Sequence, residues 1–157
     1  MYKRIFVILG NYFPPKLNIF FYKLAGIKFN YKNIWIGNKC YIDTQFPSLI
    51  EINDNVCISS NVSLIAHFDP TMSIQNHFIK SYKKKIIIKE GVFVGPGSII
   101  LPGVIIGKNS FIRAGSVISK SVPDNSLVEG NPQKIILKLS KKNSSLINQI
   151  NKRNLIN

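Results

Sequence analysis

The sequence holds two histidines, and one of them stands where a catalytic base could act. His67 closes the segment Ile58–His67, directly before residues 69–86, a stretch of polar, aromatic and basic side chains. A neutral imidazole, whose unperturbed pKa is about 6.5, can take a proton from a substrate near neutral pH. A lone histidine is more often structural, but its place beside a long loop favours chemistry. We therefore predict that His67 is a general base, and we interpret His77, inside the loop, as solvent-exposed.

The sequence gives only weak signals for other kinds of catalysis. Two histidines ten residues apart with Asp69 nearby are a poor zinc pattern, and we predict no metal. An enzyme that hydrates its substrate with a bound metal would need three histidine ligands. Because each chain has two histidines, three could be supplied only by more than one subunit. No serine-nucleophile or phosphate-loop motif is present. Gly95, Gly103 and Gly107 have the spacing of turn glycines.

A six-residue period indicates the elements that position His67. Ile, Val and Leu make up 47 of the 157 residues, so six such residues at a fixed step have a chance probability on the order of 0.001. This period suits neither an amphipathic helix nor a hairpin, and it predicts a parallel β-helix that buries one aliphatic side chain per rung. The aliphatic column is Ile88, Val94, Ile100, Ile106, Ile112 and Ile118, and a column of small residues follows it at Val92, Ser98, Val104, Ser110, Ser116 and Val122.

An earlier block of repeats is expected from about Ile34. An insertion around Phe46–Ser48 shifts its phase. The aliphatic column of this block is Ile36, Ile42, Ile52, Ile58 and Leu64, and the column behind it is Cys40, Phe46, Val56, Val62 and Phe68.

The chain divides into three parts on this pattern. Residues 1–30 show helical spacing broken at Pro14–Pro15, which predicts two short amphipathic helices. We interpret them as a cap over the open end of the coil, with a basic helix lying on anionic lipid as the alternative. Residues 31–137 are expected to form the β-helix, with 69–86 extruded as a loop, and 138–157 to form a polar tail.

A further column indicates an oligomer. Its members directly precede inward residues, so strand alternation points them outward. We interpret them as one apolar stripe five rungs long, which should be buried against another copy of the chain. The column is Phe93, Ile99, Ile105, Phe111 and Val117.

The net charge of +14 predicts attraction to anions such as nucleic acid, an acidic membrane surface or a polyphosphate ligand. No helix-turn-helix, zinc-finger or aromatic single-strand-binding pattern is present, which argues against nucleic acid.

The apolar run Ile5–Leu9 is too short for a signal peptide or a membrane span. Cys40 is expected to face inward and Cys57 outward, which argues against a disulfide. We therefore expect a cytoplasmic protein, with peripheral contact to the inner face of the membrane as an option.

Four segments carry a resemblance to a known family. They are IKEGVFVG at 88–95, LPGVIIGKNS at 101–110, RAGSVISK at 113–120 and GNPQK at 130–134. In this order they resemble the hexapeptide-repeat acetyltransferases of the galactoside and xenobiotic type. The resemblance covers about residues 26–137. The opening helices and the Phe46–Pro47 insertion are similar to members that O-acetylate bacterial surface polysaccharides.

The resemblance implies an all-β fold, a left-handed parallel β-helix assembled as a homotrimer with active sites between neighbouring subunits. It implies acetyl-coenzyme A (acetyl-CoA) as donor. His67 matches the catalytic histidine, which would take the proton of an acceptor hydroxyl as its oxygen attacks the thioester. Asp43 matches a position that contacts the acceptor in some relatives, and Asp69 could orient an imidazole or a sugar hydroxyl.

The resemblance also implies a donor site. Ala114, Ser119 and Lys120 match residues that line the groove for the pantetheine and nucleotide. Lys134 matches a basic residue that meets the phosphates. Phe93 stands where the family often has Trp, and a backbone amide near Gly95 is the expected oxyanion donor.

We conclude from the sequence that the protein is an acetyl-CoA-dependent O-acetyltransferase acting on a sugar hydroxyl in surface polysaccharide biosynthesis. The first alternative is an N-acetyltransferase of an amino sugar, or another small-molecule acetyltransferase. The second is a non-catalytic β-helix scaffold.

Overall fold

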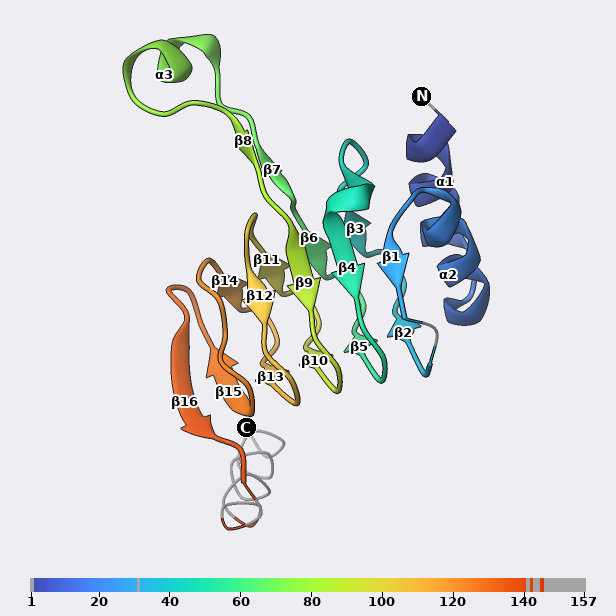
Figure 1. The fold of residues 1–157 in the computed structure, drawn as a ribbon, viewed down its shortest axis with the longest axis vertical. Coiled ribbons are helices and arrows are strands. Elements are labelled where there is room, and N and C mark those ends of the chain that lie inside the picture. Colours follow the sequence, from blue (N-terminus) through green and yellow to red (C-terminus); the bar gives the residue numbers. More distant parts are fainter. Residues whose placement is uncertain (1, 31, 141, 143–144, 146–157) are drawn as a thin grey trace.

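The computed structural model describes residues 2–30, 32–140, 142 and 145 (Figure 1). Two helices, α1 (Tyr2–Tyr12) and α2 (Pro15–Leu24), open the chain as expected. They lie beside β1 and β2, at one end of the stack of strands (Figure 1). Asn18 Nδ2 of α2 donates to the carbonyl oxygen of Ile36 at 2.8 Å, and the buried Tyr22 hydroxyl donates to Asn11 Oδ1 of α1 at 2.8 Å. The first bond attaches α2 to the first coil of strands, and the second joins α2 to α1.

The strands of the coil form three sheets, which the chain visits in the same order on each circuit. Where nothing is inserted, one circuit takes 18 residues, as in the pairing of Phe93 with Phe111. The predicted parallel pairing is confirmed. Sheet A contains β1 (Lys28–Phe29), β4 (Ile50–Ile52), β9 (Ile86–Ile88) and β12 (Ile105–Ile106). Sheet B contains β2 (Trp35–Ile36), β5 (Cys57–Ile58), β10 (Phe93–Val94), β13 (Phe111–Ile112), β15 (Ser126–Glu129) and the antiparallel β16 (Lys134–Lys138). Sheet C contains β3 (Tyr41–Ile42), β6 (Ser63–Leu64), β11 (Ile99–Ile100) and β14 (Val117–Ile118).

The aliphatic column fills the interior between the three sheets. All six members from Ile88 to Ile118 are fully buried, and so are Ile36, Ile52, Ile58 and Leu64 of the earlier block. Cys40 is buried while Cys57 is half-buried on the outer side, and both thiols are free. The predicted aliphatic core is confirmed, and so is the prediction that Cys40 faces inward and Cys57 outward.

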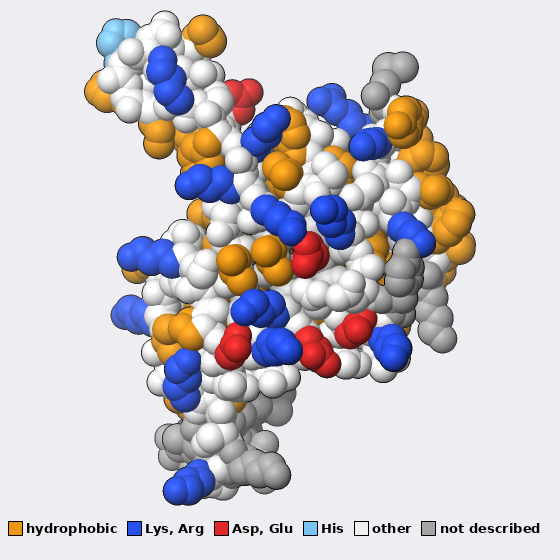
Figure 2. Space-filling model, viewed as in Figure 1, with side chains coloured by type: hydrophobic (Ala, Val, Ile, Leu, Met, Phe, Trp, Pro, Cys, Tyr) orange, Lys and Arg blue, Asp and Glu red, His pale blue; other side chains and the backbone are white. Residues whose placement is uncertain are grey.

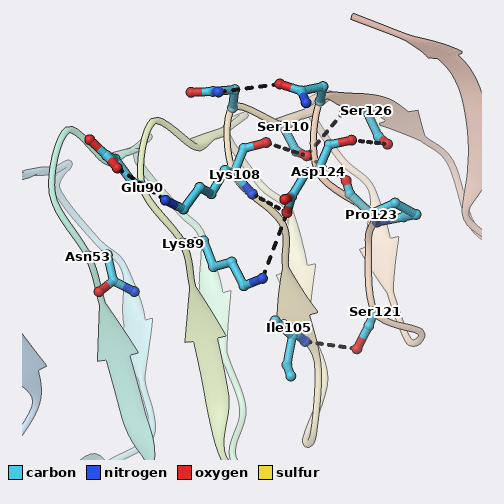
Figure 3. A network of polar contacts seen from close by, with 12 residues as sticks. Asn53, Lys89, Glu90, Ile105, Lys108, Ser110, Ser121, Pro123, Asp124 and Ser126 are labelled. Carbon is cyan, nitrogen blue, oxygen red and sulfur yellow. Dashed lines mark hydrogen bonds and ion pairs between the residues drawn. The ribbon is translucent and has the colours of Figure 1, made fainter.

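The small column lies at the corners between sheets, where only a short side chain fits. Ser110 Oγ, at the corner between sheets A and B, donates to the carbonyl oxygen of Pro123 at 2.9 Å and accepts from the Ser126 amide at 3.2 Å (Figure 3). Asp124 Oδ1 accepts from the Lys108 amide at 2.8 Å in the same corner. Successive corners are thus bonded to each other along the stack.

Two members of the expected inward column do not point inward. Phe46 is half-buried and Phe68 is exposed, because both lie where the chain leaves the coil after sheet C. Phe46 begins the 3-10 turn η1 (Pro47–Leu49), which accommodates the insertion. The first strand, β1, also begins before the expected start near Ile34. One extra residue between Phe29 and Ile36 breaks the six-residue step there.

The outward apolar residues do not form one stripe, so that interpretation was wrong. A step of six residues moves the chain to the next sheet, and consecutive members therefore face three different ways. Phe93 and Phe111 stack on sheet B with ring centroids 4.6 Å apart. Ile99 and Val117 pair on sheet C, and Ile105 is on sheet A.

Residues 69–86 contain more structure than the loop expected from the sequence. β7 (His67–Phe68) and β8 (Tyr82–Lys83) pair as an antiparallel ribbon that carries the short helix α3 (Met72–His77) away from the coil (Figure 1). We call residues 67–85 the arm. His77 is exposed there, as expected. β16 ends at Lys138, and of the tail expected at 138–157 all but 138–140, 142 and 145 lie outside the described residues.

Candidate active site

Asp43 directly follows β3, at the corner where the chain passes from sheet C to sheet A. Its carboxylate is fully buried and accepts four hydrogen bonds. Oδ1 accepts from the amides of Gln45 and Phe46, both at 2.9 Å, in the manner of an Asx turn. Oδ2 accepts from the Ala66 amide at 2.9 Å and lies 2.5 Å from His67 Nδ1. The insertion after β3 thus holds this carboxylate in one orientation.

Burial alone would raise the pKa of Asp43, but the hydrogen bonds from His67, Phe46, Ala66 and Gln45 outweigh it and hold the pKa below its ordinary value. Asp43 is therefore ionised at neutral pH and can only accept hydrogen bonds.

His67 lies at the start of β7, one circuit further along the same corner. Because Asp43 is an acceptor, His67 Nδ1 must carry the proton of their hydrogen bond, and in the neutral imidazole Nε2 then has the lone pair. The Phe46 ring packs edge-on against the imidazole, with centroids 5.5 Å apart. The His67 side chain remains 17% exposed, whereas Asp43 is 0% exposed. This arrangement can present a neutral, oriented base to a ligand at the surface.

An open cavity of about 280 Å³ lies at His67 and the base of the arm. Asp69 is exposed there, and its Oδ1 accepts from Ser81 Oγ at 2.5 Å. Lys83 Nζ stands 4.7 Å above the Phe46 ring. The cavity therefore combines aromatic faces with hydrogen-bonding groups of both kinds. Its lining is Gln45, Phe46, His67, Phe68, Asp69, Ser81, Tyr82 and Lys83.

Asp43 and Asp69, both expected near the acceptor, have different environments. Asp69 lines the cavity beside His67. Asp43 lies beneath the imidazole with both oxygens occupied, so no acceptor can reach it. We therefore change its proposed role from contact with the acceptor to orientation of His67.

Two of the residues expected at the donor lie together in a second cavity, of about 460 Å³. Ala114 and Lys134 line it near the carboxyl-terminal end of the coil, together with the ion pair between Arg113 and Glu129. The remaining lining residues are Gly130, Asn131 and Pro132.

Gly95 lies directly against Ala114 of the next circuit. A Cβ at Gly95 would come within 2.5 Å of the Ala114 amide nitrogen, so the two coils can approach this closely only because residue 95 is glycine. The Gly95 amide donates to the carbonyl oxygen of Ile112 at 2.8 Å, and the Gly97 amide donates to that of Ser60 at 3.2 Å. The expectation of an oxyanion donor near Gly95 therefore fails for these two amides, because the coil itself uses them.

Ser119 and Lys120 lie at the next corner, after β14. Their amides both donate to Gln133 Oε1, at 2.7 and 2.8 Å, and Gln133 Nε2 returns a bond to the Lys120 carbonyl oxygen at 3.0 Å. A ligand at this corner would meet the Ser119 hydroxyl and the Lys120 ammonium rather than the backbone. Phe93 lies apart from both cavities, stacked on Phe111.

The two cavities share no lining residue, but both lie beside sheet C. Gly95 and Ala114 follow β10 and β13 at the corner that leads into sheet C. His67, Ser119 and Lys120 are at the corner that leads out of it. Within the described residues, no group of three or more His, Cys, Asp and Glu side chains is placed to hold a metal ion.

Sequence reasoning missed part of the cavity at His67. Gln45, Ser81, Tyr82 and Lys83 belong to the insertion and the arm, which have no periodicity to place them. The proximity of Asp43 and His67 follows from the strand register. Ile42 and Leu64 are neighbours in register on sheet C, so the residues that follow them must meet at one corner.

Comparisons with known proteins agree with the repeats. The family described as bacterial transferase hexapeptide (six repeats) matches residues 85–120. The protein CapG of Staphylococcus aureus is 44% identical over an alignment of 115 residues, and the match covers 66% of this chain and 64% of that protein. The chain spans about half to two thirds of the length of the curated relatives it matches.

Solved structures share the fold. A galactoside acetyltransferase in complex with coenzyme A superposes with a TM-score of 0.70 at 24% identity, covering 90% of this chain and 80% of that one. The polySia-specific acetyltransferase NeuO superposes with a TM-score of 0.56 at 31% identity, covering 68% of this chain and 45% of that one.

Short parallel strands in three sheets, a corner repeated every six residues and an aliphatic interior define a hexapeptide-repeat protein. Residues 85–120 match the bacterial transferase hexapeptide family, and the resemblance inferred from the motifs is confirmed.

Proposed function

We propose that the protein is an acetyl-CoA-dependent O-acetyltransferase that acts on a sugar hydroxyl in the assembly of a surface polysaccharide. The observation that carries this proposal is the hydrogen bond between Asp43 Oδ2 and His67 Nδ1, which leaves Nε2 as the free ring nitrogen of a side chain that lines an open cavity. A structural histidine needs no such exposure. The galactoside acetyltransferase that shares the fold binds coenzyme A, and NeuO acts on a polysaccharide.

His67 supplies the base in this mechanism. An alcohol is too weak an acid to ionise first, so Nε2 must take the hydroxyl proton while the sugar oxygen attacks the donor. Asp43 stabilises the imidazolium that forms and keeps the ring from turning. His67 then returns the proton to the leaving thiolate sulfur. The acetyl ester is formed, the thioester bond is broken and the imidazole is again neutral.

The donor would supply an acetyl group activated as a thioester, and the second cavity fits its chemistry. Lys134 and Arg113 bring positive charge to the cavity, although Glu129 neutralises part of it. Lys120 adds an ammonium at the neighbouring corner. Ala114 leaves the wall free of bulk where a narrow, uncharged arm could pass, and Gly95 lies against Ala114 in the preceding circuit. We propose these residues, with Ser119, as the donor site, and we leave out Phe93 because it lies apart from this cavity.

We propose a left-handed β-helix over residues 31–137, capped by the helices of residues 1–30, as the catalytic unit. We also propose that three copies complete the site. Within one copy, the cavity at His67 and the donor cavity share no lining residue. A neighbouring copy packed against sheet C could therefore place the donor cavity of one copy next to His67 of another. Two free cysteines fit a reducing cytoplasm.

The cavity at His67 suits a carbohydrate acceptor. Phe68 and Tyr82 pack with ring centroids 5.4 Å apart and offer apolar faces to a sugar ring. At the edge of the cavity, Asp69 offers a hydrogen-bond acceptor, Ser81 a hydroxyl and Lys83 a hydrogen-bond donor. We propose Asp69 as the residue that binds a sugar hydroxyl.

Transfer to an amino sugar is the alternative within this fold. An assay that offers the purified protein acetyl-CoA with neutral sugars and with the matching amino sugars separates the two. We expect mass spectrometry to find an ester that mild alkali removes. A product that resists alkali, formed from the amino sugars alone, would establish N-transfer. No product with any acceptor, together with no binding of coenzyme A, would support the scaffold.

A further inference from the structure

The two opening helices expose an unusually apolar surface. α1 and α2 already bury Val7, Tyr22 and Ala25 against each other and the first coil. Their outer sides are nevertheless apolar, and Figure 2 shows hydrophobic side chains gathered over these helices. We call this set the outer face. It consists of Tyr2, Ile5, Ile8 and Tyr12 of α1 and Leu17, Phe20 and Leu24 of α2.

An exposed apolar surface as large as the outer face is unusual for a protein in water. A helix at the surface of a protein usually has one apolar side, and a helix that is apolar on both sides is usually buried on both. Ile5 is 53% exposed and Phe20 is 56% exposed, so the fold of one chain does not cover them. Such patches mark contact sites.

The charge around the outer face selects its partner. The first 42 residues hold seven Lys and Arg and no Asp or Glu, and so carry half of the net charge of +14. Lys3 and Arg4 of α1 are exposed, and so are Lys28 and Lys32 just beyond α2. An apolar helix surface within basic surroundings is complementary to an anionic surface that also offers hydrocarbon.

A second copy of the chain fits this surface less well. Two outer faces docked on each other would bring two sets of basic residues together with no acid to pair them. None of the described helices is long and apolar enough to cross a membrane, so a bilayer would be met at its surface. Tyr and Phe side chains suit that interfacial depth.

We propose that α1 and α2 dock the protein on an anionic phospholipid bilayer, with the outer face inserted below the headgroups. Lys3 and Arg4 would then lie at the level of the lipid phosphates. This inference goes beyond the proposed function and does not depend on it, because the outer face includes no residue of either cavity.

Vesicle flotation of the full chain tests the proposal, with vesicles of phosphatidylcholine alone and with phosphatidylglycerol mixed in. We expect binding to the anionic vesicles only. Ile5→Ser with Phe20→Ser should weaken this binding at least about tenfold, since two large apolar side chains no longer insert. The matched control is Phe78→Ser with Ile79→Ser, which removes exposed apolar side chains from the arm and should leave binding unchanged.

Lys3→Gln with Arg4→Gln should weaken binding about 25-fold, at roughly fivefold for each basic residue near an anionic surface. Lys80→Gln with Lys142→Gln removes the same charge elsewhere and should have a smaller effect. Turnover of a soluble acceptor should stay the same in all four variants, which separates this test from that of the proposed function.

Three results would overturn the proposal. The first is equal binding to neutral and anionic vesicles, or binding to neither. The second is binding to soluble polyglutamate that is as tight as binding to vesicles and that Ile5→Ser with Phe20→Ser does not weaken. This result would indicate that the partner is an acidic protein. The third is loss of the oligomer in that variant with no change in vesicle binding, which would show that another copy covers the outer face.

Discussion

Asp43 Oδ2 lies 2.5 Å from His67 Nδ1, and it does so from beneath the ring, out of reach of any substrate. The two residues come from successive circuits of the coil and meet at one corner because β3 and β6 pair in register. The carboxylate fixes the tautomer and the direction of the imidazole. Its effect on a reaction would therefore pass entirely through His67.

The substitution Asp43→Asn should lower kcat by about 10²- to 10⁴-fold with little change in KM for either substrate. An amide can present the wrong hydrogen-bonding group to Nδ1, so Nε2 no longer carries the lone pair. Steady-state kinetics measure the effect, and Asp54→Asn, a carboxylate outside both cavities, is the control. Equal kcat in the wild type and Asp43→Asn would remove the orienting role.

Stability should depend on pH through Asp43. Its folded-state pKa is below the unfolded value of about 3.9, so the ionised carboxylate stabilises the fold above that pH. This contribution is lost as the pH falls through the folded-state pKa. The wild type should have a higher Tm than Asp43→Asn at pH 7, and the gap should close as the pH is lowered from about 5 toward 2. A gap that stays constant over this range would contradict the account of the pKa.

Two neighbouring isoleucines test the six-residue period as a stability rule. Ile106 is fully buried between the sheets, and Ile106→Ala should lower the free energy of unfolding by about 2–5 kcal/mol. Ile105 points outward from the same strand and is 37% exposed, so Ile105→Ala should cost less than about 1 kcal/mol. Urea unfolding of both variants gives the comparison. Similar losses would show that the interior is not where the strands place it.

The proposed trimer predicts different effects on two faces of the coil. The outward residues of sheet C are Tyr41, Ser63, Ile99 and Val117, with no charge among them. Those of sheet A are Lys28, Glu51, Ile87 and Ile105, of which two are charged. Ile99→Lys should therefore dissociate the oligomer, and Ile105→Lys should leave it intact. Sedimentation velocity distinguishes these results. A monomeric wild type, or dissociation by Ile105→Lys alone, would exclude sheet C as the interface.

The coil could be predicted from the sequence because each of its rungs repeats one physical requirement. Ile100 and Ile106 are buried for the same reason, so a single period places both. That period also had a limit. It showed that Phe93 and Ile99 point outward but not that they face different ways, because the direction depends on the three sheets that make one circuit.

The insertion and the arm could not be predicted in this way. Gln45 and Lys83 reach the cavity at His67 through bends that no repeat determines. The role of Asp43 was also hidden, since a sequence shows that a carboxylate is near a histidine in space only once the register is known. The six-residue rule thus places the scaffold, and its two interruptions after sheet C build the cavity.

The most direct test of the account is turnover by His67→Gln with acetyl-CoA and the best neutral sugar acceptor, beside His77→Gln as the matched control on the arm. The account predicts that His67→Gln lowers kcat by about 10²- to 10⁴-fold while coenzyme A binding and the oligomer are retained, and that His77→Gln behaves as the wild type. Undiminished turnover by His67→Gln would contradict it.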